Sequence, residues 1–375
     1  MRVLHTLARV AVTASEVSET LSLIAAGRSL GIEPSLVVAR DDVDVMGARL
    51  SALGLADVPL AAVDFPRGVS HRSLSDAWRL HRLAAGADIV HCHLAHDHWL
   101  AALSTRKPLV RSRHTLARPA GHLANRWLFA RRTAALLGVS HRSLLPYGVL
   151  GVPHERLVVI PGGVDGQRFH PNRDGRPVRN ILHIPQDAYV IGMVAKLRAV
   201  KGHEDLLTAL AMLEPPAPDW RLLVVGGAGG RPAGGARPLL ETLKEKAAAL
   251  GIAERVLWLG YREDVAELMA ACDVGVIASH RSHGATRVGL EWAAAGRAIV
   301  ATQVGVLDEY FSDGRDALLV PARSPAALAS AITRLAREPG FRRTLGRHAR
   351  AVVEANHLWP DLARRALEVY QRALA

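Results

Sequence analysis

Residues 274–302 hold the sequence's clearest pattern for chemistry. An apolar run at 274–278 is typical of a buried parallel strand, a polar loop with one glycine follows, and residues 288–294 form a predicted helix that stops at Gly296. A strand that leads through a loop into a helix leaves backbone N–H groups at the positive end of the helix dipole. This arrangement binds anions such as a diphosphate. Glu291, one turn into the helix, could accept hydrogen bonds from a ribose.

The stretch 291–302, EWAAAGRAIVAT, resembles the motif EAxAxGxPVVAT of glycosyltransferase family 4, whose members are retaining enzymes with the GT-B fold. Other matches follow in the family's order. They are PGGVD at 161–165 for PNGVD, AKLRAVKG at 195–202 for GRLxxxKG, GYR at 260–262, and DGRDALLVP at 313–321 for DGxxGLLV-P. The resemblance runs from about residue 109 to the end of the chain and is looser before that.

The resemblance implies that a nucleotide sugar is the co-substrate, without a metal ion or a protein nucleophile. It assigns the leaving diphosphate to Lys196, Lys201 and the loop amides around Thr286 and Arg287, with Glu291 on the ribose. Cations suit this place because the charge of the diphosphate grows as the glycosidic bond breaks. The other expected nucleotide-binding residues are Gly192, Tyr261, Arg262 and Val288.

Position 283 departs from the family motif. The family has a glutamate there, which contacts the donor sugar, whereas this chain has His283. A neutral imidazole offers one hydrogen-bond donor and one acceptor, and its cationic form offers donors alone. We expect His283 to act at the catalytic site and to favour a donor with a carboxylate or another acceptor-rich group. The alternative is that His283 turns into the loop and caps the helix.

His114 is the candidate catalytic residue of the first half of the chain. It follows the strand predicted at 109–111, and ligands of α/β sheets bind at the carboxyl ends of strands. The resemblance implies that His114 lies in the cleft near the transferred sugar, rather than being a packed histidine. The loop at 11–15 lacks the Gly-Gly pair that is usual in the family, so its side chains crowd a diphosphate.

The run 91–98, HCHLAHDH, contains four histidines, and imidazoles are common ligands of transition metals. No H-E-x-x-H motif or cysteine pair accompanies the run, and histidines after this strand are ordinary in the family. We therefore expect no metal site and no cofactor besides the nucleotide sugar.

The net charge of +12 is unevenly distributed. Residues 98–154 contain no Asp or Glu but many arginines, which suits an anionic membrane surface or a lipid-linked or phosphorylated acceptor. The alternative is a solvated basic face in an arginine-rich chain. Aromatic residues make up 5% of the chain and do not alternate with the arginines, so we expect no nucleic-acid partner.

The expected fold class is α/β. We predict two Rossmann-like, doubly wound domains that face each other across a cleft, with a C-terminal helix that crosses back to the first domain. The expected parts are an acceptor domain at 1–171, a linker at 172–185, a donor domain at 186–356 and the helix segment at 357–375. Within the first domain, residues 125–136 are predicted as a helix and 137–140 as a short strand.

Other features indicate a cytoplasmic protein, peripheral on the inner face of the membrane if the basic region meets lipid. Cys92 and Cys272 lie beside apolar runs and are expected to be buried, reduced thiols. The N-terminus lacks the form of a signal peptide, and no stretch of about 18 apolar residues predicts a membrane span.

The implied function is retaining transfer of a sugar, with a UDP-sugar as the favoured donor, to a hydroxyl of a glycan, lipid-linked or small-molecule acceptor. Glycan, lipopolysaccharide or glycolipid synthesis is the expected setting. Two alternatives remain. One is a catalytically degenerate partner or scaffold subunit, which His283 and the loop at 11–15 support. The other is a different GT-B enzyme, such as an epimerase or a transferase with a non-hydroxyl acceptor.

Overall fold

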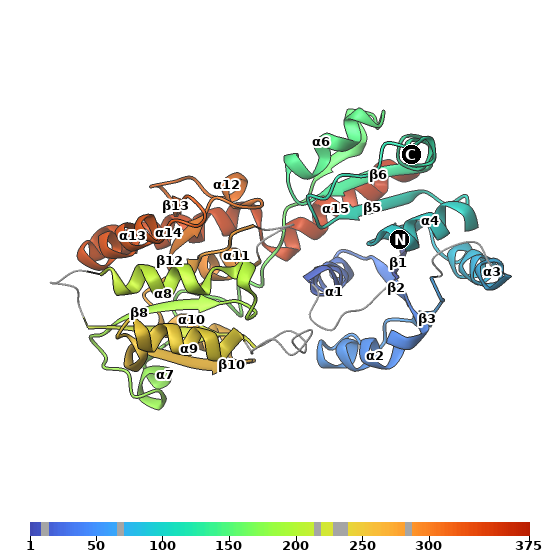
Figure 1. The fold of residues 1–375 in the computed structure, drawn as a ribbon. Coiled ribbons are helices and arrows are strands. Elements are labelled where there is room, and N and C mark those ends of the chain that lie inside the picture. Colours follow the sequence, from blue (N-terminus) through green and yellow to red (C-terminus); the bar gives the residue numbers. More distant parts are fainter. Residues whose placement is uncertain (9–14, 66–70, 214–218, 228–238, 282–286) are drawn as a thin grey trace. The chain divides into compact units, whose positions relative to one another are not determined.

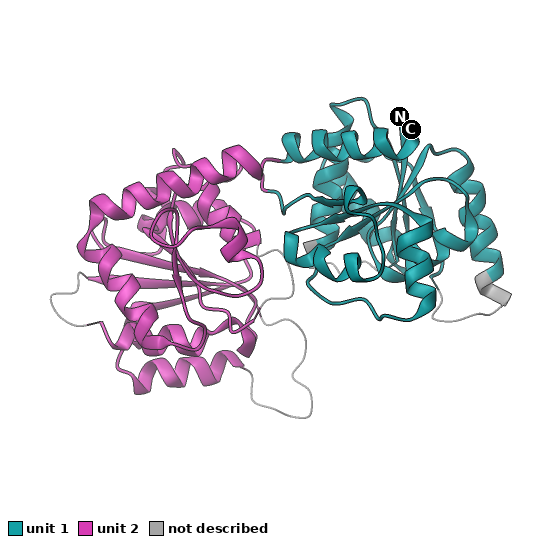
Figure 2. Ribbon diagram, turned by 90° about the horizontal axis from the view of Figure 1, so that it is seen from above, with its two compact units in different colours: residues 1–163, 359–375 teal, residues 164–358 magenta. Residues whose placement is uncertain are grey.

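The structure is a computed structural model, and it describes residues 1–8, 15–65, 71–213, 219–227, 239–281 and 287–375. The chain divides into two compact units (Figure 2). Unit 1 comprises residues 1–163 and 359–375, and unit 2 comprises residues 164–358. The chain therefore leaves unit 1 once, completes unit 2, and returns for its last helix.

Unit 1 is built on a parallel sheet that has seven strands among the described residues, in the order β3-β2-β1-β4-β5-β6-β7 (Figure 1). The strands are β1 (Arg2–Leu7), β2 (Glu33–Val38), β3 (Leu60–Ala62), β4 (Ile89–Cys92), β5 (Leu109–Arg113), β6 (Thr133–Gly138) and β7 (Leu157–Val159). The helices are α1 (Ser15–Arg28), α2 (Val43–Ala52), α3 (His71–Ala85), α4 (Ala95–Ser104), α5 (Leu123–Arg126), the π-helical turn η2 (Trp127–Arg132), α6 (His141–Val149) and α15 (Trp359–Leu374).

Helices cover both faces of this sheet, as the alternation of side chains along β1 shows. Val3 packs with residues of α1 and α15, and the next residue, Leu4, packs with residues of α3, α4 and α6. Both side chains are at most 2% exposed. A strand buried on both faces has no side that faces solvent, so the polar residues His5 and Thr6 of β1 are buried as well.

Unit 2 repeats the plan with six parallel strands in its described residues, in the order β10-β9-β8-β11-β12-β13. The strands are β8 (Tyr189–Val194), β9 (Trp220–Val225), β10 (Val256–Gly260), β11 (Val274–Ile277), β12 (Ala298–Thr302) and β13 (Leu318–Val320). The helices are α7 (Arg176–Ile181), α8 (His203–Ala211), α9 (Leu239–Ala249), α10 (Val265–Ala271), α11 (Arg287–Ala294), α12 (Leu307–Tyr310), α13 (Pro325–Arg337) and α14 (Pro339–Asn356). The two doubly wound sheets confirm the predicted α/β class with two Rossmann-like domains.

One buried tryptophan seats α11 on the sheet of unit 2. Trp292 is 0% exposed and lies against β8 and β11 at the places where each strand has a glycine. A Cβ at Gly275 would lie 2.2 Å from the Trp292 ring, and one at Gly192 would lie 2.5 Å from it. The indole thus fills the space of two absent side chains.

An ion-pair cluster fastens the opposite edge of the same sheet, where β8 and β11 begin. Asp273 accepts hydrogen bonds from the Arg179 guanidinium at 3.0 Å, from that of Arg342 at 3.3 Å, and from the backbone N–H of Val190 at 2.8 Å. Arg179 is the fourth residue of α7, and Arg342 is the fourth residue of α14. One carboxylate therefore ties two helices to the sheet.

The helix predicted for residues 125–136 is wrong in its last four residues. Helical structure ends at Arg132, and residues from Thr133 onward form β6. The strand contains Ala134, Ala135, Leu136 and Leu137, residue types that favour helices in isolation. Burial between β5 and β7 overrides that preference, because a strand's conformation is decided largely by packing against its neighbours.

Among the described residues, no helix has both the length and the apolar character needed to cross a bilayer.

The packing of Trp292 predicts a large cost for a single methyl group. We expect Gly275→Ala to lower the free energy of unfolding by about 2–3 kcal/mol, because the new Cβ overlaps the fully buried ring. Urea denaturation measures the change. Gly340→Ala in α14 is the matched control. No heavy atom lies within 4 Å of a Cβ there, so the change should be below about 1 kcal/mol. Equal urea midpoints for the two variants would contradict this packing argument.

Candidate functional site

Each sheet has one point where the strand order reverses, between β1 and β4 in unit 1 and between β8 and β11 in unit 2. Connections leave these strands in opposite directions, so a crevice opens at their carboxyl ends, where doubly wound sheets bind ligands. Most of the sequence-predicted site residues lie near these two edges.

The two candidate lysines lie in the loop after β8. Backbone bonds fix this loop: Leu197 N–H donates to Gly227 O at 3.1 Å, and His280 N–H donates to Val200 O at 2.9 Å. Gly202, at φ 72°, approaches so closely that a Cβ there would lie 1.8 Å from Ala278 O. The loop is thereby held against the chain that leaves β11.

Positive charges gather in this loop. Lys201 is half-buried, and burial followed by the nearby charges of Arg198 and Lys196 lowers the pKa of Lys201. Cations that repel one another in a partly buried place gain from a bound anion, which relieves the repulsion and makes charge-assisted hydrogen bonds. Arg198 was not among the predicted site residues, although it stands between the two lysines in sequence.

Glu291 lies in α11, the helix that Trp292 anchors. Its side chain is 12% exposed, and its Oε1 accepts a hydrogen bond from the Arg287 Nε at 3.0 Å. Burial raises the pKa of Glu291, and Arg287 opposes that rise. The carboxylate is held in one orientation and is largely screened from water. His283 and Thr286 lie outside the described residues.

Of the remaining predicted nucleotide-site residues, Tyr261, Arg262 and Val288 lie after a strand or at the start of a helix, whereas Gly192 lies inside a strand. Tyr261, 73% exposed, and Arg262 follow β10, whose Gly260 O accepts the N–H of Gly226 at 2.7 Å after β9. Arg262 is bonded to the Asp264 carboxylate at 2.7 and 2.5 Å. Val288 is half-buried at the start of α11. Gly192, by contrast, lies inside β8 beneath Trp292, so its lack of a side chain is explained by packing.

A cavity of about 730 Å³ also occurs in unit 2, but it lies at the amino ends of β8 and β11. Its lining includes Arg179, Asp273 and Arg342, the ion-pair cluster that fastens this edge. Because ligands of doubly wound sheets bind at the carboxyl edge, we assign this cavity no part in the candidate site.

In unit 1, His114 follows β5 and pairs with a glutamate of α1. Its Nδ1 lies 2.7 Å from Glu19 Oε2, and the two side chains are 10% and 7% exposed. A cavity of about 30 Å³ lies beside them, with Ser112 and Arg113 in its lining. This volume is about that of one water molecule.

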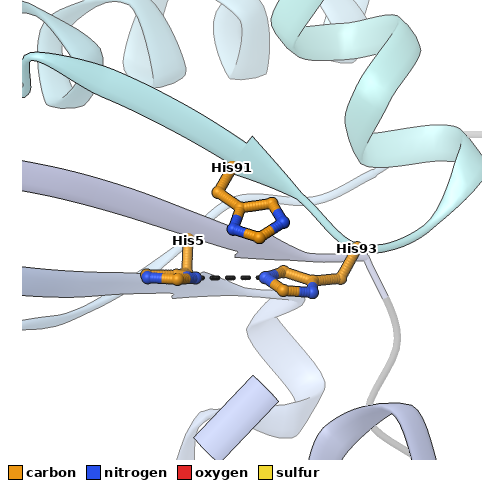
Figure 3. Close-up of side chains that lie close together, drawn as sticks. All are labelled: His5, His91 and His93. Carbon is orange, nitrogen blue, oxygen red and sulfur yellow. Dashed lines mark hydrogen bonds between the residues drawn. The ribbon is translucent and has the colours of Figure 1, made fainter. Parts of the chain in front are cut away.

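His5, His91 and His93 form a buried group next to His114, here called the histidine cluster (Figure 3). His5 Nδ1 lies 3.0 Å from His93 Nε2, and the ring of His91 stacks on that of His93 with centroids 4.2 Å apart. His91 is also bonded on both nitrogens, to Tyr370 of α15 at 2.6 Å and to Ser112 at 2.8 Å.

The cluster resembles a metal site in composition but not in geometry. Its ligand atoms lie within 4.8 Å of one another, but the planes of His91 and His93 are only 28° apart. Lone pairs lie in the ring planes, so stacked rings do not aim at one point. The other histidines of the run 91–98 diverge, since His96 is exposed and His98 bonds Thr133. The expectation that no metal binds stays a prediction.

Sequence reasoning missed Glu19 and His5. Glu19 is separated from His114 by 95 residues, and no local pattern joins them. His5 had a weak signal, because it pairs with His91 in the register of β1 and β4. Side chains of paired residues point to the same face of a sheet, so the predicted strands could have brought these two rings together.

The two doubly wound units define a protein of the GT-B type, and comparisons with known proteins identify it further. Residues 20–168 match the model of "Glycosyltransferase Family 4", and residues 176–352 match that of "Glycosyl transferases group 1". The chain is 30% identical over 352 residues to a D-inositol 3-phosphate glycosyltransferase of Streptomyces scabiei, covering 86% of this chain and 75% of that protein. A protein of the same description from Thermomonospora curvata is 30% identical over 325 residues, with coverages of 78% and 74%.

Solved structures agree on the fold. A glycosyltransferase from Rickettsia africae superposes with a TM-score of 0.86 at 20% identity, covering 100% of this chain and 98% of the other. Anabaena Alr3699/HepE in complex with UDP gives 0.83 at 21% identity, with coverages of 99% and 100%. The chain belongs to glycosyltransferase family 4, which confirms the family inferred from the motifs.

The buried histidines predict that unit 1 loses stability in mild acid. Burial lowers the pKa of His5 to about 3, and it lowers the pKa values of His91, His93 and His98 well below their usual range. The unfolded chain therefore takes up protons below pH 6.5 that the folded unit does not, and stability falls as pH falls through this window. Asp97 and Asp76 act oppositely, because burial raises the pKa of Asp97 to about 6 and also raises that of Asp76, but they are two groups against four.

We expect urea denaturation at pH 7, 6 and 5 to show this decline. His98→Asn should flatten it by up to about 1.4 kcal/mol per pH unit, the contribution of one titrating group. His96→Asn, an exposed position on the same helix, is the control and removes no buried imidazole. A free energy of unfolding that rose for the wild type as the pH fell from 6.5 to 5 would contradict this prediction.

Proposed function

We propose that this glycosyltransferase moves a sugar from a nucleotide sugar to an acceptor hydroxyl, with retention at the anomeric carbon and without a metal ion. The observation that carries the proposal is the edge of unit 2 where the cationic loop of Lys196 and Lys201 and the buried carboxylate of Glu291 are both held in place. A diphosphate and a ribose are the two groups that these side chains suit. Structures of Anabaena Alr3699/HepE contain UDP and UDP-glucose, which supports a UDP-sugar as the donor.

In this reaction the bond from the anomeric carbon to the diphosphate oxygen breaks, and a bond to the acceptor oxygen forms on the same face. An oxygen of the leaving phosphate takes the acceptor's proton. Lys196, Lys201 and the amides at the start of α11 stabilise the leaving group, while Glu291 holds the ribose. Tyr261 and Arg262 hold the base. His114 and His283 contact the transferred sugar.

We further propose a phosphorylated or lipid-linked acceptor in glycan or glycolipid synthesis. The curated relatives are named for D-inositol 3-phosphate, a phosphorylated small molecule. The basic residues at 98–154 do not all face solvent, because Arg111 is buried and Arg132 is bonded to backbone carbonyls. At the surface, Leu123 is 82% and Trp127 42% exposed, with exposed Arg126 on the same helical face, which supports contact with an anionic membrane.

Titration calorimetry with UDP-, GDP- and ADP-sugars tests the proposal. We expect binding of one nucleotide class and slow hydrolysis of its sugar. A folded protein that binds none of these donors would instead favour a degenerate partner or scaffold subunit. Binding followed by epimerisation, without hydrolysis or transfer, would favour the other alternative.

Glu291→Ala is the sharpest variant for this test. We expect it to weaken nucleoside-diphosphate binding by about 2–4 kcal/mol, through loss of charge-assisted hydrogen bonds to the ribose. Glu254→Ala is the control, because Glu254 is exposed and precedes β10 at the opposite edge of the sheet. Unchanged affinity in a folded Glu291→Ala protein would remove Glu291 from the site.

A further inference from the structure

A chain of hydrogen bonds crosses the carboxyl edge of unit 1, from a helix through three imidazoles. Glu19 Oε2 lies 2.7 Å from His114 Nδ1, His114 Nε2 lies 3.4 Å from His93 Nδ1, and His93 Nε2 lies 3.0 Å from His5 Nδ1. Its members come from α1, β1 and the residues that follow β4 and β5. Every side chain in it is at most one-tenth exposed.

Thr20 sets the direction of the bonds at His93. The Thr20 hydroxyl donates its proton to the Glu16 carbonyl at 2.8 Å, since a carbonyl can only accept. Thr20 Oγ1 also lies 3.0 Å from His93 Nδ1, so it accepts from that nitrogen and the proton is on Nδ1. Burial lowers the pKa of His93 well below its usual range, so the ring is neutral. Its Nε2 is therefore an acceptor, and His5 Nδ1 is the donor to it.

When the His114 ring is neutral, two partners decide which of its nitrogens carries the proton. With the proton on Nδ1, the ring donates to the Glu19 carboxylate and presents a lone pair at Nε2. In the other tautomer, a lone pair at Nδ1 would face the carboxylate, and an N–H at Nε2 would face the N–H of His93. Both contacts would be repulsive, so the surroundings favour one form twice over.

The lone pair at His114 Nε2 is incompletely used. The contact with His93 is long at 3.4 Å, and the His93 proton is already engaged by Thr20 at 3.0 Å. The cavity of about 30 Å³ lies against this group, with Glu19, His93 and His114 all in its lining. It has room for one oxygen atom with its proton.

We propose that Glu19 is a positioning residue, which with His93 holds His114 in the Nδ1–H tautomer so that Nε2 accepts a hydrogen bond from a single hydroxyl group. The hydroxyl belongs to the transferred sugar, and in that respect the inference rests on the proposed function. Glu19 does not touch the substrate; it acts through the imidazole, as the carboxylate partners of metal-bound histidines do.

The tautomer is tested without any substrate. In protein labelled with ¹⁵N-histidine, long-range ¹H–¹⁵N spectra report which nitrogen of each ring carries the proton. We expect the Nδ1–H pattern for His5, His93 and His114 in the wild type. Glu19→Ala should convert His114 to a mixture of tautomers, and Glu19→Gln, whose amide oxygen still accepts, should preserve the pattern. An Nε2–H tautomer at His114 in the wild type overturns the proposal.

The kinetic test separates positioning from structural support. In donor hydrolysis we expect Glu19→Ala to lower kcat by about 10- to 100-fold with the donor KM within about twofold, as for other residues that orient a catalytic group. Glu19→Gln should recover much of the loss. His98→Asn, which alters another buried histidine of unit 1, should retain wild-type kcat. An unchanged kcat in Glu19→Ala, or an equal loss in His98→Asn, overturns the role of Glu19.

The two measurements also distinguish this inference from the proposed function. A wild-type protein that hydrolyses no nucleotide sugar contradicts the proposed function, whereas the spectra decide the tautomer of His114 in either case.

Discussion

The packing of unit 2 depends on Trp292, whose indole ring fills the space left by two glycines in the strands beneath it. Trp292 can sit on the sheet because positions 192 and 275 carry no Cβ, and it is fully buried as a result. Successive residues of an α-helix point about 100° apart, so a helix anchored at Trp292 has no freedom to turn Glu291 elsewhere.

In unit 1, the buried carboxylate of Asp97 holds two strands together beside the point where the strand order reverses. It accepts from Thr6 at the end of β1 and from the backbone of His93 after β4, and so joins the two strands beside the reversal point.

The two carboxyl edges differ in their electrostatics. In unit 2 the loop after β8 concentrates cations whose mutual repulsion an anion relieves. In unit 1 burial keeps the histidine cluster neutral, so its rings offer directed hydrogen bonds. A nucleotide sugar has these two kinds of group, a charged diphosphate and a neutral ring of hydroxyls. In the proposed function, the side chains after each strand, and not the sheet topology, decide which of these groups an edge binds.

Local sequence patterns predicted those helices and strands whose conformation depends mainly on their own residues. A helix was predicted within residues 357–375, and α15 spans Trp359–Leu374, because its apolar residues recur at helical spacing and Pro360 suits its first turn. The helix predicted at 125–136 failed where alanines and leucines lie in a buried strand, since their intrinsic preference says nothing of the strands on either side. The same limit applies to the site. Glu291 was predicted from its own motif, whereas the bond from Glu19 to His114 links residues far apart in sequence, and only the folded sheet brings them together.

Unit 2 is an insertion between β7 and α15, and this order has a consequence for synthesis on the ribosome. Residues of α15, including Ala363, Ala366 and Tyr370, cover Val3, Ile89 and Val110 in the core of unit 1. The strands of unit 1 are therefore made before the helix that closes this face of their sheet. Unit 2, which is continuous in sequence, can complete its own core earlier. Although domains generally fold in the order in which they are made, the core of unit 1 can be completed only after all of unit 2 has been made.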